Sequence, residues 1–379
     1  MQKDATTNIN HTTIYVGMDV HKDSYTLCAF DVTMPEPSHI VKVPASYQQI
    51  LKYLERMRDF FGANAHFICG YEAGCLGYSL YHQLIACNVD CIILAPNTML
   101  KSSGKRIKTD SRDAKLIAQC LAYHTYSEVS VPSKSDEEIK EYIRMRNDHK
   151  IQLKSTKQQI LAFCLRHNIK YKDGSKYWTT RHLLWIRSLK LEPMLQEILD
   201  EYMITFEGLV AKIERLDHRI EEFAKREEYC ESVRKLTCFL GIKTYTALAI
   251  IAEISDFNRF PSADKFAAFL GLVPGEHSSG DKELRLGITK AGNKFVRTIL
   301  TESAHSYSRG QIGRKSKALR ARQAGNSPAF IAYADRANER LRRRHHYMAA
   351  KGKHANIIKT SIARELACFI WGAMTNHTQ

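Results

Sequence analysis

Two runs of apolar, strand-forming residues open the chain, and a short polar turn separates them. The first run ends on Asp19, and the second extends from Tyr25 to Phe30 after the turn residues His21 to Ser24. Two such runs joined by a short polar turn predict an antiparallel hairpin. An aspartate that closes the first strand would stand at a sheet end, where a metal ion can reach its carboxylate.

Strand and helix patterns then alternate as far as about residue 125. A basic loop, KSSGKRIK, precedes a helix for which either Thr109 or Asp110 is a credible N-cap. The run VDCIILA is nearly continuous and apolar, which suits a central strand covered on both faces. This alternation predicts a mixed α/β sheet over residues 12–130. The expected elements are strands at His39–Val43, Ala65–Cys69 and Val89–Ala95 and helices at Tyr47–Phe61 and Leu76–Cys87.

Residues 131–230 have the composition of a helical arm, with few glycines or prolines and with charged and apolar residues interleaved. Asp136–His167 is helical and polar, and breaks are expected near Asp173-Gly174 and Pro193. A heptad seam of about four heptads follows, which is typical of a coiled coil. Its members are Leu195, Leu199, Tyr202, Phe206, Leu209, Ile213, Leu216, Ile220 and Phe223.

Two packing arrangements would bury this seam. Packing of the two halves of the arm within one chain would satisfy it equally well. We favour oligomerisation through the seam, because one half of the arm offers a poor apolar partner.

Residues 231–379 predict a mostly helical, basic domain. Two apolar helices flank Leu240-Gly241-Ile242, the pattern of a helix-hairpin-helix, whose turn lets backbone amides approach a DNA phosphate without reading bases. A short helix at Phe260–Leu272 and a polar, glycine-rich stretch of expected loops follow. The chain ends in an apolar helix, Ile357–Met374, which we expect to pack in the core.

The charge of the chain indicates a polyanionic partner. The formal net charge is +16, and a surplus of this size favours DNA or RNA. Basic residues concentrate between residues 305 and 360, with tyrosines and histidines among them, which suits phosphate contacts and stacking on bases. A solvated helix face is the alternative. The candidate contacts here include Arg314, Lys315, Arg342, Arg343 and Arg344.

The spacing of the cysteines and the length of the apolar stretches indicate the cellular compartment. The 10 cysteines are scattered without a C-x-x-C pair, which argues against a disulfide scaffold or a zinc ribbon. The N-terminal stretch is polar, and no apolar stretch approaches the length of a membrane span. We therefore expect a reducing cytoplasm and no membrane.

Four acids fall where a metal site needs them. Asp19 lies at the end of a strand and Glu72 just past another, and Asp110 and Asp113 are three residues apart and so share one face of a helix. Magnesium prefers carboxylate oxygens, and two such ions can activate the attacking oxygen and stabilise the leaving one in phosphoryl transfer. A single aspartate is more often a cap or turn residue, and Asp110 as an N-cap stays open. Together the acids predict a Mg²⁺ site with two ions.

Several separated motifs resemble one protein family. GMDVHKDSYTLCAFD, YEAGCLGYSLYHQL and KTDSRDAKLIA resemble the three acidic motifs of the DEDD-type transposases of bacterial insertion sequences, the IS110 family, which in turn resemble Piv-type DNA invertases. LTCFLGIKTYTALAIIAEI and FAAFLGLVPGEHSSGDKELRLGITKAGNKFVRTIL resemble the second domain of these transposases. The resemblance covers nearly the whole chain, although the helical arm matches in character only. It implies a RuvC-like, RNase H-type N-terminal domain whose metal-binding tetrad is Asp19, Glu72, Asp110 and Asp113.

The resemblance also implies a serine nucleophile. The family places it in a Ser-Gly pair, which here is Ser279-Gly280, and the adjacent Ser278 stays open as an alternative. Without the resemblance, Ser279 reads as a turn serine. A serine hydroxyl can attack a phosphodiester and hold the strand covalently for rejoining. The nearby candidates for binding the scissile phosphate are Arg285, Lys290, Asn293 and Arg297.

These expectations combine into a DNA recombinase with Mg²⁺-dependent strand cleavage and rejoining. The resemblance adds a structured guide (bridge) RNA that pairs with donor and target DNA. It also adds a homo-oligomer, a dimer or a tetramer in the assembled complex, with a site that protomers share. Two alternatives stay open: a junction-resolving, metal-dependent endonuclease that uses water, and a non-catalytic nucleic-acid-binding factor.

Overall fold

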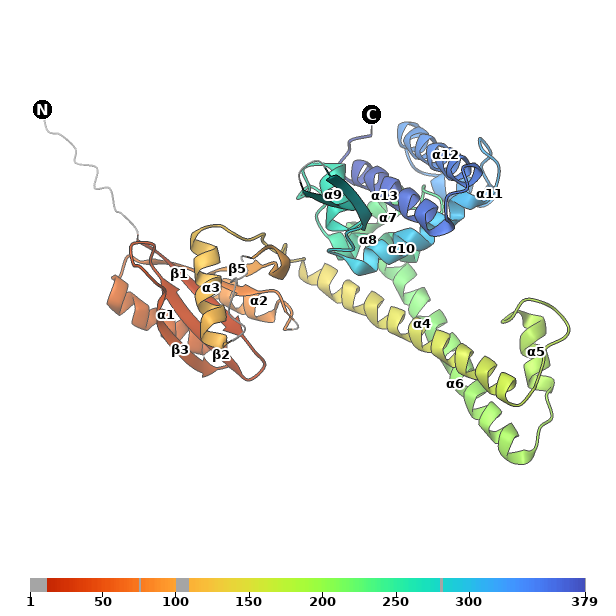
Figure 1. The fold of residues 1–379 in the computed structure, drawn as a ribbon, viewed down its shortest axis with the longest axis horizontal. Helices are drawn as coiled ribbons and strands as arrows, with labels where there is room; N and C mark the ends of the chain where they lie inside the picture. Colours follow the sequence, from red (N-terminus) through yellow and green to blue (C-terminus); the bar gives the residue numbers. More distant parts are fainter. Residues whose placement is uncertain (1–11, 75, 100–108, 280–281, 379) are drawn as a thin grey trace, which may run out of the picture. The chain divides into compact units, whose positions relative to one another are not determined.

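The computed structural model describes residues 12–74, 76–99, 109–279 and 282–378, without the side chains of residues 97 and 276–285. The predicted basic loop KSSGKRIK lies outside the described residues. The chain divides into two compact units, residues 1–131 and 132–379 (Figure 1). The second unit therefore contains both the predicted helical arm and the predicted C-terminal domain.

The first unit is built on a five-stranded mixed sheet with the strand order β3-β2-β1-β4-β5. β1 pairs antiparallel with β2 and parallel with β4, β2 pairs antiparallel with β3, and β4 pairs parallel with β5. The predicted hairpin and mixed α/β sheet are confirmed. The elements are β1 Thr13–Val20, β2 Ser24–Phe30, β3 Ser38–Pro44, α1 Tyr47–Phe61, β4 His66–Glu72, α2 Ser79–Ala86, β5 Asp90–Leu94, the 3₁₀ helix η1 Pro96–Thr98 and α3 Asp110–Ala122.

Helices cover both faces of this sheet, and the period of two along β1 decides which residue meets which helix. Ile14, Val16 and Met18 are buried in one core with apolar residues of α1 and α2. The alternate residue Tyr15 packs into a second, smaller core formed largely by α3. Asp19 lies in the second series, so its side chain projects toward the face that α3 covers.

Strand β5 corrects one expectation from the sequence. Its apolar run indicated a central strand, but β5 lies at an edge of the sheet. The segment that follows α3 covers part of that edge: Ala95 N donates to Ser127 O at 2.9 Å, and Val129 N donates to Ile93 O at 2.8 Å. Burial by a crossing segment therefore explains why an edge strand is as apolar as a central one.

The second unit is mostly helical. One large core unites most of its helices, and the last of them, α13, contributes Ile362, Leu366 and Ile370 to it, which confirms that the C-terminal apolar helix packs in the core. None of the described helices is long and apolar enough to cross a membrane. The elements are α4 Lys134–Arg166, α5 Thr180–Ser188, α6 Pro193–Phe223, α7 Glu227–Leu236, α8 Thr244–Ile254, α9 Ala263–Phe269, β6 Pro274–Ser279, β7 Lys282–Ile288, α10 Lys294–Ala304, the 3₁₀ helix η2 His305–Ser308, α11 Lys317–Gln323, α12 Pro328–Ala350 and α13 Ala355–Met374.

The heptad seam of α6 is buried inside the chain. α4 and α6 lie side by side, and α5 lies near their far end (Figure 1). Leu199 and Phe206 pack with Ile160 and Phe163 of α4 and with Ile186 of α5. The preference for oligomerisation through this seam is therefore corrected, because α4 and α5 together provide the apolar partner that one half of the arm was thought to lack.

Two further expectations about the second unit change. Gly241 has a φ of +81°, and a Cβ there would lie 2.3 Å from Ser303 O, so the turn between α7 and α8 packs against α10. Leu240 N donates to Asn338 Oδ1 at 2.8 Å, and Ile242 N donates to Phe239 O, so neither amide is available to a phosphate. The glycine-rich stretch expected as loops forms the two-stranded β6–β7 hairpin instead.

Candidate metal centre and candidate nucleophile

Two glycines bring helix α3 onto the sheet next to the candidate metal ligands. Gly17 of β1 and Gly70 of β4 are paired in register. A Cβ on Gly17 would lie 2.1 Å from the backbone oxygen of Ala114, so only glycine allows this approach, while one on Gly70 would lie 2.8 Å from Leu121 Cδ2, a side-chain end that would have to shift. Since side chains alternate along a strand, residues two positions further on face the same side as α3. Asp19 and Glu72 occupy those positions.

The start of α3 carries the other two acids. Thr109 has extended backbone at the N-cap position, although its side chain makes no capping bond, and Asp110 and Asp113 lie in the first helical turn. Asp110 as the N-cap is therefore excluded. Acids in a first turn also interact favourably with the helix dipole.

Asp19, His21 and Asp110 form the close group at this site. His21 Nε2 lies 3.1 Å from Asp19 Oδ2 and 4.0 Å from Asp110 Oδ1. One ligand atom from each of the three residues lies within 4.8 Å of the others. The Asp19 side chain is 15% exposed, whereas those of Asp110 and His21 are 42% and 58% exposed. An ion could therefore reach the group from solvent.

The electrostatics of the group favour a cation. Burial raises the pKa of Asp19, and the nearby carboxylates of Asp113 and Asp110 raise it further, while His21 acts in the opposite direction. Like charges that crowd a partly buried carboxylate disfavour its ionised form. A bound cation would relieve this repulsion.

Lys42 already neutralises one of these acids. Its Nζ donates to Asp110 Oδ2 at 2.8 Å. This hydrogen bond and the charge of Lys42 hold the pKa of Asp110 below its ordinary value. The sheet register explains the contact, because Asp19 pairs with Thr26 and Thr26 pairs with Lys42, which places the three residues in one row across three strands.

The predicted tetrad is thus brought together in part. Asp113 is close enough to affect the pKa of Asp19. Glu72 is exposed at the end of β4, and in the described part of the chain the close ligand group contains neither Glu72 nor Asp113. Sequence reasoning missed Lys42 and treated His21 as a turn residue. The Asp-x-His spacing at a strand end was a signal for His21, whereas Lys42 gave none.

Ser279 is the last residue of β6, and its backbone pairs with Lys282 of β7. Ser278 pairs with Glu283 one position earlier. Gly280, and the side chains of both serines and of Arg285, lie outside the described residues. The backbone places the predicted nucleophile at the end of a hairpin strand, and its role stays a prediction.

Two of the predicted phosphate ligands near this hairpin make internal hydrogen bonds. Asn293 Oδ1 accepts from Val296 N at 2.9 Å and so caps α10, while its Nδ2 donates to Glu253 Oε2 at 2.8 Å. Arg297 Nη1 donates to the carbonyl oxygens of Leu270 and Ala291, each at 2.8 Å. Their phosphate contacts stay a prediction, although both side chains hold the fold together. Lys290 is exposed.

The predicted contacts of the basic region differ in their surroundings. Arg342 is 8% exposed, and its Nη1 donates to Gln311 O at 2.7 Å and to Arg314 O at 3.2 Å. Lys315 forms an ion pair with Asp335. Arg314, Arg343 and Arg344 are exposed, although Arg343 pairs with Glu339 and Arg344 pairs with Glu365. Of these five residues, Arg314 is therefore the best placed to meet a phosphate.

Comparison with known proteins decides the family. The DEDD-type IS110 transposase model matches residues 16–168, which include the four acids. The model described as "Transposase IS116/IS110/IS902 family" matches residues 233–320, which include Ser279. "Putative transposase y4qE" of Sinorhizobium fredii is 33% identical over 358 residues, covering 94% of this chain and 87% of that protein. This chain belongs to the IS116/IS110/IS902 family of transposases.

Other relatives extend this family assignment. The transposase for insertion sequence element IS1533 of Leptospira borgpetersenii is 29% identical over 343 residues, covering 90% of this chain and 98% of that protein. The pilin gene-inverting protein of Moraxella bovis is 24% identical over 301 residues, covering 76% and 80%. The resemblance identified from the sequence motifs is confirmed. As a member of this family, the chain is a DNA transposase or recombinase, an enzyme that acts on DNA.

Proposed function

We propose that this IS110-family transposase cleaves and rejoins DNA strands with a serine nucleophile and a carboxylate-bound divalent metal, most simply Mg²⁺. The observation that carries the proposal is the close group of Asp19, His21 and Asp110 at one end of the sheet. The mixed sheet with the order β3-β2-β1-β4-β5 supports a RuvC-like assignment of the first unit. The family membership supports the reaction class.

The residues of the close group fit a divalent metal. Asp19 and Asp110 offer carboxylate oxygens, the ligands that Mg²⁺ prefers, and His21 offers an imidazole nitrogen. Asp113 and Glu72 are further carboxylates from the same face, in keeping with two ions. When bound, such a metal stabilises charge that develops on a phosphodiester oxygen and makes a nearby hydroxyl more acidic. Lys42 would compete with it for Asp110.

The covalent step is assigned to Ser279, with Ser278 as the alternative. The serine Oγ attacks phosphorus, a Ser–O–P bond forms, and the bond from phosphorus to the leaving strand oxygen breaks. The serine proton passes, in net terms, to the leaving oxygen. Energy of the broken bond is kept in the new phosphodiester, so a strand hydroxyl can reverse the step and rejoin the DNA. The end position of Ser279 in β6 supports its access to a strand.

The partners of this reaction are donor and target DNA, a structured guide (bridge) RNA and further copies of the chain. The net charge of +16 supports polyanionic partners of both kinds. We propose that the transposase assembles as a homo-oligomer and that it acts at the bacterial nucleoid.

Trapping of cleaved DNA under denaturing conditions tests the serine. Wild-type protein with Mg²⁺ should give a protein–DNA adduct, and Ser279→Ala should not, while Ser278→Ala serves as the matched neighbour. If Ser279→Ala still formed the adduct and Ser278→Ala did not, the nucleophile would be Ser278. Cleavage by wild type without any adduct would favour the water-using endonuclease instead.

Substitution of the acids tests whether the protein uses the metal centre for catalysis or only binds nucleic acid. Asp19→Ala and Glu72→Ala should each abolish recombination while DNA binding persists. Recombination that survives both substitutions would refute a role for the metal centre.

A further inference from the structure

A groove of about 690 Å³ lies in the second unit, where α4 runs past the start of α10. Arg144, Lys150 and Lys154 line it from α4, and Lys294 lines it from α10. The apolar side chains of Tyr245 and Phe295 form part of its wall. None of its lining residues belongs to the acidic group on the sheet of the first unit, and Asn293, one of the phosphate contacts predicted from the sequence, is part of its lining.

The lining residues that α4 contributes form a continuous row along the groove. Arg144, Asn147, Ile151 and Lys154 are separated by three, four and three residues, so they lie on one face of the helix. Ten residues of helix advance by ~15 Å. This face can follow an extended charged chain over several of its repeating units.

The charges that line the groove are not fully balanced. Glu302 is the one acid among the described residues of the lining, and Lys150 Nζ lies 3.4 Å from its Oε2. Glu253, behind the lining, pairs with Arg144. Lys154 and Lys294 are exposed, and no ion pair to another described residue occupies either of them. Two ammonium groups on opposite walls are therefore uncompensated.

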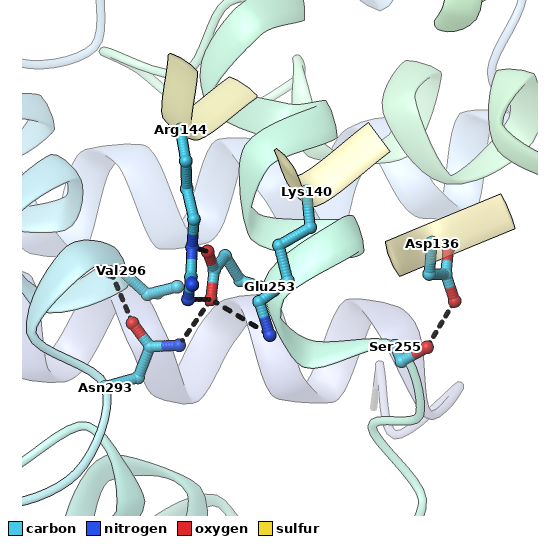
Figure 2. A network of polar contacts seen from close by, with 7 residues as sticks. All are labelled: Asp136, Lys140, Arg144, Glu253, Ser255, Asn293 and Val296. Atoms are coloured by element: carbon cyan, nitrogen blue, oxygen red, sulfur yellow. Dashed lines mark hydrogen bonds and ion pairs between the residues drawn. The ribbon is translucent and has the colours of Figure 1, made fainter. Parts of the chain in front are cut away.

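A buried carboxylate fixes the two walls relative to each other (Figure 2). Glu253 of α8, with a side chain 1% exposed, accepts from Arg144 Nε at 2.8 Å and Nη2 at 3.2 Å. The same carboxylate accepts from Asn293 Nδ2 at 2.8 Å, and Asn293 caps α10. Lys140 Nζ adds a longer contact of 3.8 Å from α4. The groove is thus held in shape by the fold.

We propose that this groove binds the phosphodiester backbone of a nucleic acid, DNA or RNA, through Lys154 and Lys294. Paired cations across a preformed, elongated groove suit successive phosphates, and the apolar wall suits the sugar edges between them. The inference rests on the proposed function, because that function supplies the nucleic acid. An acidic protein segment is the alternative occupant, and salt slopes that do not differ between the groove and control variants would favour it.

The test compares two double variants of the full-length protein. Lys154→Gln/Lys294→Gln removes the two uncompensated charges, and Lys212→Gln/Lys225→Gln removes two exposed lysines outside the groove lining. Fluorescence anisotropy measures affinity for a labelled DNA duplex and for a labelled RNA stem-loop over a series of KCl concentrations. Each lost phosphate contact lowers the slope of log affinity against log salt by ~0.9 on duplex DNA, so the groove variant should lose ~1.8. The control should lose well under one.

The outcomes separate the sources and the hypotheses. A reduced slope on DNA alone, on RNA alone or on both supports the groove and says which backbone occupies it. Equal slopes for the groove and control variants on both probes would overturn the inference, and would leave an acidic protein segment as the occupant to pursue. If the wild-type protein showed no metal-dependent cleavage, the proposed function would be overturned, but the salt dependence of binding would still test the groove.

Discussion

Removal of the Glu253 carboxylate is the most informative test of how the second unit is held together. The side chain is 1% exposed and pairs with Arg144, which is 46% exposed, and with Lys140, which is 14% exposed. Breaking a buried ion pair by deleting one partner costs about 3–5 kcal/mol, because the other charge is left without compensation. Arg144 can turn partly to water, so we expect Glu253→Ala to lose about 3 kcal/mol, the low end of that range.

The measurement is urea unfolding followed by the helical circular dichroism signal, since most described helices belong to the second unit. The midpoint should fall, and the slope with urea should stay unchanged if only stability is affected. A loss of about 3 kcal/mol is a large fraction of a typical domain stability of about 5–15 kcal/mol.

Glu302→Ala is the matched control. Glu302 pairs with Lys150 near the same groove, but the two side chains are 60% and 50% exposed. Exposed pairs contribute about 0–1 kcal/mol. If Glu253→Ala cost no more than Glu302→Ala, the network of Figure 2 would not be a buried tie and the reasoning would be refuted.

Four further predictions follow from the site and the arm. Gly17→Ala should lower the free energy of unfolding by about 1–3 kcal/mol and weaken metal binding, because the new Cβ would press on the α3 backbone; unchanged calorimetric metal affinity would contradict this. Lys42→Met should tighten Mn²⁺ binding at pH 7.5 by roughly two- to five-fold, since an ammonium no longer competes for Asp110; weaker binding would make Lys42 a supporting residue. Because burial raises the pKa of Asp19, protons compete with the metal for this carboxylate up to a higher pH than at an ordinary aspartate. Calorimetric Mn²⁺ affinity should therefore still rise with pH above the ordinary aspartate range, and Asp19→Asn should make that rise smaller. Phe206→Ala should lower the free energy of unfolding by about 3–5 kcal/mol without changing the oligomeric state measured by light scattering, because its side chain is buried within the chain. If the substitution instead dissociated an oligomer, the seam of α6 would be an interface between protomers.

The sequence by itself determined most of the local elements. The helix predicted at Tyr47–Phe61 has those bounds in the structure, and the hairpin, the third strand and the C-terminal apolar helix were found where expected. Periodicity of apolar residues is a property of neighbouring positions, so it can be read without knowing what the element packs against. Helix α2 begins later than predicted, at Ser79, because a turn with Gly77 at a φ of +65° precedes it.

Only the tertiary structure decided which residues meet. The seam of α6 favoured an external partner by its pattern, but α4 and α5 fill that role. Likewise, the four acids could be selected from spacing and resemblance, yet the contact of Lys42 with Asp110 required the strand register. Register and helix docking depend on contacts between distant segments, and no local pattern encodes them. The four acids could therefore be predicted from the sequence, whereas the charge balance of the candidate metal centre was set by the fold.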